Sequence, residues 1–283
     1  MKKIAIIPNP TKDVGLKVTN EIIRRLLRGD IEPYIHSKYR VEAIAETTFY
    51  DELPNDVELI IVTGGDGSVI DASVEAIAKD VPLLGVNLGK VGYLSEVDPS
   101  GLDILDKLFT GEYTLENKML LSVFFEKDGE LIYSSRLGVN DIIISHDTFL
   151  GIADIKLENS SGERVKYRAD GMILSTPAGT TAYSLSAGGP IVAHDIDSIV
   201  ATPICPHSFF NRSIMFNPNE RIKISNIGKP SLNVSVDGRF FTTLKEGEAC
   251  CVEMSEKRLK MLTFNKNNTF STLFKKMRIL EDM

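Results

Sequence analysis

Apolar residues in the first part of the chain, up to about residue 115, alternate between short continuous runs and runs with helical spacing. The run from Lys3 to Ile7 predicts a strand. From Leu16 to Arg28 the apolar positions recur with the helical period, and Gly29 follows where a helix would end. This alternation is typical of parallel strands joined by crossover helices.

Two further apolar runs, 58–63 and 81–88, continue the same pattern. The first leads directly into a glycine turn at 64–67, and a helix is predicted after it. The apolar positions of that helix are Ile70, Val74, Ile77 and Ala78. A shorter helix over 102–109 is closed by Gly111. Strand, glycine turn and helix therefore follow one another without a gap.

After about residue 120 the pattern changes to short alternating runs separated by Gly, Asn, Asp and Pro, which predicts a β-rich unit. Inside this unit only 180–187 has helical spacing. The last segment has it again, at Phe270, Leu273, Phe274 and Met277. We therefore predict an α/β domain made of residues 1–118 and 265–283, and a β-rich domain over 119–264.

Composition excludes several classes of function. The 283 residues are 43% hydrophobic and 25% charged, which is enough apolar surface for a core, and the formal net charge is −7. A negative chain is a poor general binder of nucleic acid, whose affinity rests on basic surfaces. No apolar run approaches the roughly 20 residues that span a bilayer. We expect a soluble, cytoplasmic protein with no nucleic-acid or membrane partner.

Cysteine and histidine spacing does not indicate a metal. The three cysteines are Cys205, Cys250 and Cys251, and no pair has the two-residue gap of a zinc knuckle. No two of the four histidines lie one helical turn apart. We expect no structural metal.

Asp66 is the distinctive residue of the glycine turn formed by Gly64, Gly65, Asp66 and Gly67. Backbone N–H groups of such a turn, at the start of a helix, favour phosphate. A carboxylate beside phosphates is repelled unless a cation is present or the acid takes part in the chemistry. Asp66 could therefore accept the proton of an attacking hydroxyl while Mg²⁺ binds the donor phosphates. Alternatively, Asp66 only caps the helix or occupies a turn.

Asn140 and Asp141 interrupt an otherwise apolar run from Leu137 to Ser145 that predicts a strand. Buried polar groups need partners. An amide can donate to and accept from an adenine edge, and a carboxylate can accept from ribose hydroxyls. The alternative for such an isolated pair is a β-bulge or turn.

A second candidate ligand loop runs from Ser175 to Ser184, where small residues would let a ligand approach the backbone. Its candidate contact residues are Ala178, Thr181, Ala182 and Tyr183. The alternative is a helix cap with Tyr183 in the core. Just upstream, Arg168 and Asp170 are either further ligand contacts or an exposed salt bridge.

Taken in order, the glycine turn, the Asn140 and Asp141 pair and the loop through Tyr183 resemble the NAD kinase family. The resemblance covers nearly the whole chain. It also includes the segments 85–89, 92–94, 170–171, 206–208 and 236–238. The resemblance implies an N-terminal Rossmann-like α/β domain, a C-terminal β-sandwich-like domain and a C-terminal segment that returns to the first domain. It also implies a homo-oligomer, commonly a tetramer.

The resemblance also implies a role for each candidate residue. Asp66 would activate the ribose 2′-hydroxyl of NAD, and Gly64, Gly65 and Gly67 would shape the phosphate turn. Asn140 and Asp141 would hold the adenosine, and the adenine and ribose pocket would be lined by Thr181, Ala182 and Tyr183. Asp170, with Arg168 as a weaker candidate, would approach the nicotinamide end from an adjoining subunit. Many family members have glutamate where this chain has Asp141, and most have arginine where it has Lys118.

The predicted function is therefore Mg²⁺-dependent phosphoryl transfer from ATP or polyphosphate to NAD, giving NADP. Because lipid kinases and phosphofructokinases share the first motif, a kinase of another alcohol is the main alternative. A nonenzymatic NAD-sensing protein is a second alternative, although it would have no use for Asp66.

Overall fold

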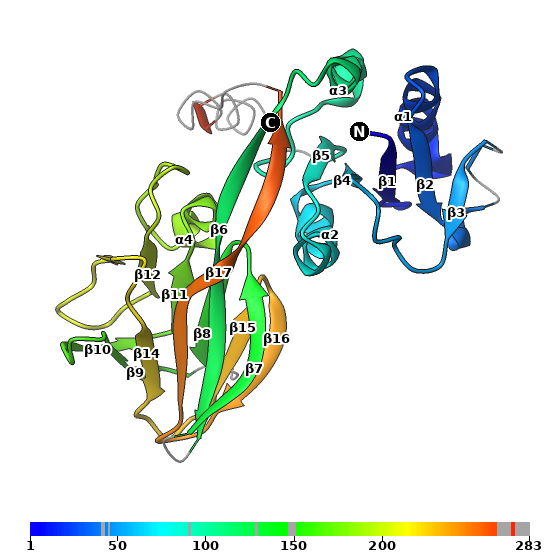
Figure 1. Cartoon of the computed structure of the whole chain (residues 1–283). Coiled ribbons are helices and arrows are strands. Elements are labelled where there is room, and N and C mark those ends of the chain that lie inside the picture. The colour runs from blue at the N-terminus through cyan, green and yellow to red at the C-terminus, as the bar shows by residue number, and fades with distance from the viewer. Residues whose placement is uncertain are drawn as a thin grey trace. The chain divides into compact units, whose positions relative to one another are not determined.

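The computed structural model describes residues 1–40, 43–44, 46–89, 92–127, 130–146, 151–264 and 273–274. The chain divides into two compact units. Unit 1 consists of Met1–Asn117 and Leu259–Met283, and unit 2 consists of Lys118–Arg258. Two long strands, β6 (Thr114–Lys127) and β17 (Ala249–Thr263), contribute residues to both units (Figure 1).

Unit 1 contains a parallel sheet in the order β5-β4-β1-β2-β3. Its strands are β1 (Lys3–Pro8), β2 (Glu32–His36), β3 (Thr48–Tyr50), β4 (Leu59–Gly64) and β5 (Leu83–Asn87). The end of β17 joins the sheet in parallel beside β5, where Met261 pairs with Leu83. All six residues of β4 are buried, as expected of a central strand covered on both faces.

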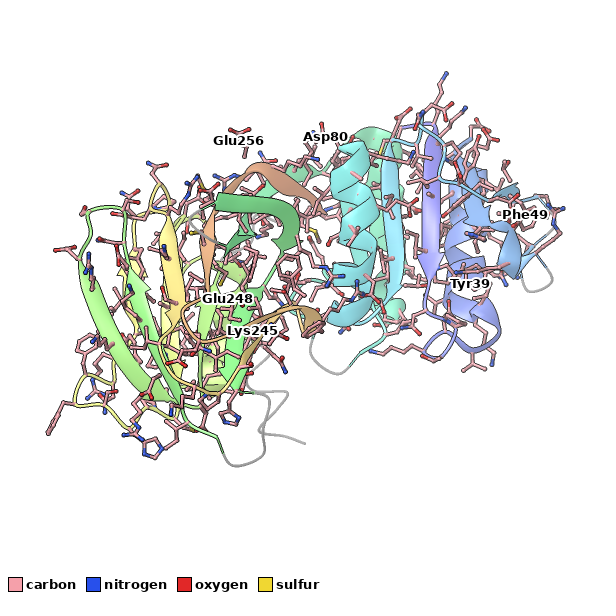
Figure 2. The ribbon with its side chains drawn as sticks, turned by 90° about the horizontal axis from the view of Figure 1, so that it is seen from below. Tyr39, Phe49, Asp80, Lys245, Glu248 and Glu256 are labelled. Atoms are coloured by element: carbon pink, nitrogen blue, oxygen red, sulfur yellow. The ribbon has the colours of Figure 1, made fainter. Side chains whose placement is uncertain are left out.

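Helices connect these strands. They are η1 (Val14–Leu16), α1 (Lys17–Arg28), η2 (Ser37–Tyr39), α2 (Asp66–Lys79), η3 (Pro99–Asp106) and α3 (Lys107–Thr110). Helix α1 ends at Gly29 as predicted, and α3 is followed by Gly111 in the left-handed conformation. Helix α2 is followed by Asp80 (Figure 2), whose backbone is also left-handed.

The apolar face of α2 differs from the predicted one. Val74 is 61% exposed and Ala78 is also exposed. Of the predicted positions Ile77 is buried, and the rest of the buried face consists of Val69, Ala72, Ser73 and Ala76. Most of these side chains are small, so helical spacing of the larger apolar residues misplaced the face that packs in the core.

The order of the parallel strands determines where loops gather. The chain leaves β1, β4 and β5 at the same edge of the sheet, because parallel strands end at the same side. The strand order reverses between β1 and β4: β1 continues to β2, whereas β4 continues to β5 on the other side. In open α/β sheets ligands bind at such a reversal, outside the carboxyl ends of the strands. The glycine turn follows β4 at this position.

Unit 2 consists of antiparallel strands in two sheets. One sheet has the order β13-β12-β11-β8-β15-β16, and the other contains β10, β9, β14 and β17, with β6 beside β17 and β7 beside β6. The strands not yet given are β7 (Glu130–Gly138), β8 (Asp141–His146), β9 (Ala153–Glu158), β10 (Arg164–Ala169), β11 (Gly171–Ser175), β12 (Ile199–Ile204), β13 (Ile214–Phe216), β14 (Ile222–Asn226), β15 (Leu232–Val236) and β16 (Arg239–Leu244).

A single apolar cluster is built from both sheets of unit 2, with Ile144 and Leu174 from one and Ile155 and Val252 from the other. This is the packing of a β-sandwich. The predicted fold class, an α/β part and a β-rich part, is confirmed.

Two predicted elements of unit 2 are interrupted. The strand expected over 137–145 is divided between β7 and β8, with a bend at Val139 and Asn140. The helix expected over 180–187 is instead a 3₁₀ turn, η4 (Ala178–Thr181), and a single helical turn, α4 (Tyr183–Ser186). Ala182 separates them with a non-helical ψ of −129°.

The predicted helix in the C-terminal segment 265–283 lies outside the described residues, apart from Leu273 and Phe274, which are helical. Within the part of the chain that the structure describes, no helix is long and apolar enough to cross a membrane.

Candidate functional site

The glycine turn of unit 1 is crowded at two of its glycines and open at the third. A Cβ on Gly64 would overlap the side chain of Ser68, and one on Gly65 would overlap the ammonium of Lys12. A Cβ on Gly67 would meet nothing within 4 Å. Because Gly67 is exposed and lies in the first turn of α2, its surroundings are open to a ligand.

The carboxylate of Asp66 is held by backbone N–H groups of a neighbouring loop. Tyr93 donates its N–H to Oδ2 and Leu94 donates to Oδ1, both at 2.9 Å. This loop follows β5, so Asp66 ties together the chain segments that leave β4 and β5. Both oxygens of this half-buried side chain thus have a structural partner, a role that the sequence analysis did not foresee. A carboxylate oxygen has two acceptor sites, so each retains one for a further donor.

Asn9 and Lys12, in the loop that precedes α1, also reach the glycine turn, and the sequence motifs did not include them. The Asn9 amide donates to Ser68 Oγ at 2.8 Å, and its backbone N–H donates to the Thr63 carbonyl at 2.8 Å. The Lys12 ammonium lies 3.4 Å from where a Cβ on Gly89 would be, in addition to its position at Gly65. They lie more than 50 residues before the turn in sequence, and no motif connects them.

In unit 2, Asn140 and Asp141 are fixed by the half-buried carboxylate of Asp237, which follows the end of a strand that is distant in sequence. Asp237 accepts backbone N–H groups of Val139 and Asn140 at 2.8 Å and of Asp141 at 3.1 Å. In return, the Asp237 N–H donates to the Asp141 carbonyl. Three N–H groups converging on one carboxylate produce the bend, so the polar pair does sit at a turn between strands.

The second ligand loop packs against this bend. Thr176 donates its N–H to the Asn140 carbonyl at 2.9 Å and its hydroxyl to the Val139 carbonyl at 2.7 Å. A Cβ on Gly179 would overlap the Asn140 carbonyl oxygen, so only glycine allows this approach. The structure therefore brings the second and third sequence motifs together.

The loop residues differ in their exposure. Ala178 and Thr181 are buried, and the Thr181 hydroxyl donates to the Ala178 carbonyl at 3.0 Å. Ala182 is half-buried, whereas Tyr183 is 44% exposed and therefore not a core residue. Among the four candidates, Tyr183 is the one with a ring free to stack on a ligand.

Arg168 and Asp170 lie elsewhere in unit 2. Asp141 pairs with Ser175 at one end of the β8 and β11 ladder, whereas Gly171, next to Asp170, pairs with Ser145 at the other. Four residues of strand separate the two ends, which is about 13 Å. Arg168 forms an ion pair with Asp154 at 4.0 Å, and Asp170 lies 3.9 Å from His146 Nε2. They do not form a salt bridge with each other.

The electrostatics of the adenosine candidates are unusual. Asp141 is 4% exposed. Burial, and then the nearby charge of Asp237, raises the pKa of the Asp141 carboxyl to about 7. Burial also raises the pKa of Asp237, opposed by the three N–H groups it accepts. Near neutral pH Asp141 can therefore present either an acceptor pair or an O–H donor.

No group of three or more metal-ligating side chains occurs among the described residues.

Residues 4–113 match the ATP-NAD kinase N-terminal domain, and residues 139–264 match the ATP-NAD kinase C-terminal domain. The chain belongs to the NAD kinase family. The family suggested by the sequence motifs is thereby confirmed.

Other members of the NAD kinase family are similar along their whole length. The chain is 35% identical to the NAD kinase of Thermoanaerobacter pseudethanolicus, covering 98% of this chain and 99% of that one. It is 32% identical to the NAD kinase of Lachnoclostridium phytofermentans, with 96% and 98% covered.

Two solved structures have the same fold. Yeast NADH kinase complexed with NADH has a TM-score of 0.84 at 21% identity, with 98% of this chain and 88% of that chain covered. The NAD kinase from Archaeoglobus fulgidus in complex with ATP has a TM-score of 0.74 at 23% identity, with 98% and 99% covered.

Proposed function

We propose that this chain is an NAD kinase, which transfers the terminal phosphoryl group of ATP to the adenosine ribose 2′-hydroxyl of NAD and produces NADP. Polyphosphate is the alternative donor. The observation that carries the proposal is a carboxylate, Asp66, fixed at the start of α2 beside an open glycine turn, in a chain that matches both domains of the family.

Asp66 is the proton acceptor in this proposal. The 2′-oxygen forms a bond to the terminal phosphorus, the bond from that phosphorus to the bridging oxygen breaks, and ADP leaves. The hydroxyl proton passes to Asp66. The N–H groups of Tyr93 and Leu94 hold the carboxylate in one orientation, and the remaining acceptor site on each oxygen is available to the hydroxyl.

The phosphates of the donor lie at Gly64, Gly65 and Gly67 in this proposal. Mg²⁺ would enter with the triphosphate and offset its negative charge. The protein supplies backbone N–H groups at the start of α2 and the orientation of the acceptor.

Unit 2 binds the adenosine in this proposal. Asn140 and Asp141 offer the adenine and ribose contacts, and the loop with Ala178, Thr181, Ala182 and Tyr183 lines the same place. Support comes from Thr176 and Gly179, which bring the loop against the Asn140 backbone.

Asp170 and Arg168 contact the nicotinamide end, from a neighbouring subunit of a homo-oligomeric, cytoplasmic enzyme. Their place at the opposite end of the β8 and β11 ladder supports a contact distinct from that of Asn140. A tetramer is the expected assembly, and sedimentation velocity of the purified chain measures it.

The deciding experiment is an acceptor comparison. Purified protein with ATP and Mg²⁺ is given NAD, diacylglycerol or fructose 6-phosphate, and the phosphorylated product is measured. We expect NADP and no other phosphorylated acceptor. Phosphorylation of either other alcohol in preference to NAD would favour the alternative kinase, and NAD binding without turnover would favour a sensing protein.

A further inference from the structure

Lys12 lies on a loop whose position is fixed from both ends. Asn9 connects the start of this loop to β4 and α2 through its bonds to Thr63 and Ser68. The same Asn9 carbonyl accepts the N–H groups of Lys12 and Asp13 at 3.0 and 2.8 Å. The loop therefore folds back on itself directly beside the glycine turn.

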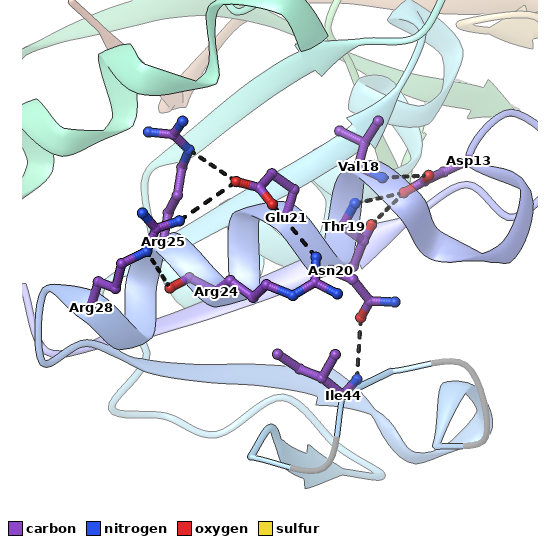
Figure 3. Close-up of polar contacts among 9 residues, drawn as sticks. All are labelled: Asp13, Val18, Thr19, Asn20, Glu21, Arg24, Arg25, Arg28 and Ile44. Atoms are coloured by element: carbon purple, nitrogen blue, oxygen red, sulfur yellow. Dashed lines mark hydrogen bonds and ion pairs between the residues drawn. The ribbon is translucent and has the colours of Figure 1, made fainter.

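The other end of the loop is fixed by Asp13, which is 3% exposed (Figure 3). Its carboxylate accepts the N–H groups of Val18 and Thr19 at 3.0 and 2.9 Å and also the Thr19 hydroxyl. The Thr19 hydroxyl lies 2.9 Å from that of Thr63 in β4. Asp13 thus joins the loop to the first turn of α1 and, through Thr19, to the strand that ends at the glycine turn.

Between these two anchors, the Lys12 side chain extends over the place where two glycine loops meet. A Cβ on Gly65 would be 3.7 Å from the Cα of Gly89 and would overlap the Lys12 ammonium. The Leu88 N–H donates to the Gly64 carbonyl at 2.7 Å, which holds the two loops together. The ammonium of this exposed residue therefore lies beside two glycines, Gly65 and Gly89, neither of which has a side chain.

This ammonium has no carboxylate partner among the residues that the structure describes. A lysine ammonium is a compact charge with three donors, well suited to phosphate oxygens. The position of the Lys12 ammonium is explained if an anionic group of a ligand pairs with it.

We propose that Lys12 binds the terminal phosphate oxygens of the donor and thereby positions the phosphoryl group over the glycine turn. The inference rests on the proposed NAD kinase function. Asp66 lies at the same turn, and the two charged side chains have different roles. Lys12 offsets the negative charge of the donor, whereas Asp66 receives the proton of the acceptor.

The test compares Lys12→Ala with Lys12→Arg and with a matched control, Lys17→Ala. Lys17 is an exposed lysine five residues further along the chain, at the first residue of α1, so its removal changes the net charge equally. ATP affinity is measured by titration calorimetry with Mg²⁺ and without NAD, and steady-state constants are measured for ATP and NAD. Circular dichroism melting checks folding.

We expect Lys12→Ala to weaken ATP binding by about 10- to 100-fold, as is usual for loss of a charged hydrogen bond. kcat/KM for ATP should fall with it, while KM for NAD stays within about twofold and the melting temperature is unchanged. Lys12→Arg should restore most of the ATP affinity, and Lys17→Ala should match the wild type.

ATP affinity unchanged in Lys12→Ala would overturn the assignment, as would a loss that falls on NAD instead. A wild-type chain that binds ATP but does not phosphorylate NAD would contradict the proposed function alone. In that case the titration with ATP still decides the role of Lys12.

Discussion

Gly67 in unit 1 and Gly179 in unit 2 both belong to the candidate nucleotide residues, yet they are surrounded differently. Around Gly179 the protein fills the space itself, since a Cβ would overlap the Asn140 carbonyl. Around Gly67 nothing lies within 4 Å. The fold therefore requires glycine at position 179, whereas the space around Gly67 would accept a side chain. The proposed adenosine residues are thus held together by the protein itself, whereas the proposed phosphate turn is open at Gly67.

The largest effect should come from Asp66→Asn, which tests whether the open turn carries the chemistry. We expect kcat to fall by about 10²- to 10⁴-fold, because a general base is lost. An amide accepts at only one of its two ends, so one of the Tyr93 and Leu94 bonds is also lost. Melting temperature and NAD affinity, measured beside kcat, separate the two effects. Full activity with unchanged NAD affinity would show that Asp66 is structural only.

Gly179→Ala should damage folding rather than chemistry. The new methyl group would overlap backbone, which cannot move as a side-chain tip can, so we expect unit 2 to lose about 3 kcal/mol of stability. Urea unfolding measures it. Gly101→Ala, at a glycine with nothing within 4 Å, is the control and should be nearly neutral. Equal stability of the two variants would disprove that the close approach of Gly179 to the Asn140 carbonyl requires glycine.

Asp141→Asn should change the pH dependence of stability. Because the pKa of Asp141 is raised to about 7, the folded state binds a proton that the unfolded state releases near pH 4. Stability is therefore lost as pH rises from about 4 to 7, and the loss persists above 7. An asparagine avoids it, giving a gain of about 1–3 kcal/mol at pH 8 and little at pH 4. Unfolding at both pH values tests this, and a gain that is equal at both would contradict the expected charge burial.

The smallest effect on the fold should come from Gly67→Ala. Alanine favours helix over glycine by up to about 1 kcal/mol, so the melting temperature should stay the same or rise slightly. KM for ATP should nevertheless increase several-fold, because the methyl group occupies the open space of the proposed phosphate site. Unchanged KM for ATP would mean that no donor phosphate approaches this glycine.

Much of the fold could be predicted from local patterns. Buried runs and amphipathic helices in unit 1 have distinct periods, and the short alternating runs of unit 2 identify antiparallel strands. The pattern missed β2 and β3, since β2 contains Pro33 and β3 has only three residues. It also predicted one helix over 180–187, where the close approach of Gly179 to Asn140 is accompanied by a break at Ala182.

Local spacing was enough to select three candidate ligand-binding segments, because glycines and polar residues inside apolar runs stand out in the sequence. They are the turn with Asp66, the pair Asn140 and Asp141, and the loop to Tyr183. It could not show that Asp237, 96 residues away, shapes the bend at Asp141.

Local patterns along the chain were enough to predict the two kinds of architecture and the family, since hydrophobic periods and ordered motifs are properties of neighbouring residues. Three features became visible in the folded chain alone: Lys12 lies at the glycine turn, Asp66 holds a second loop, and Asp170 lies away from Asn140. These depend on which strands pair and at which end each one stops, and hydrogen bonds between segments distant in sequence leave no periodic trace in the chain.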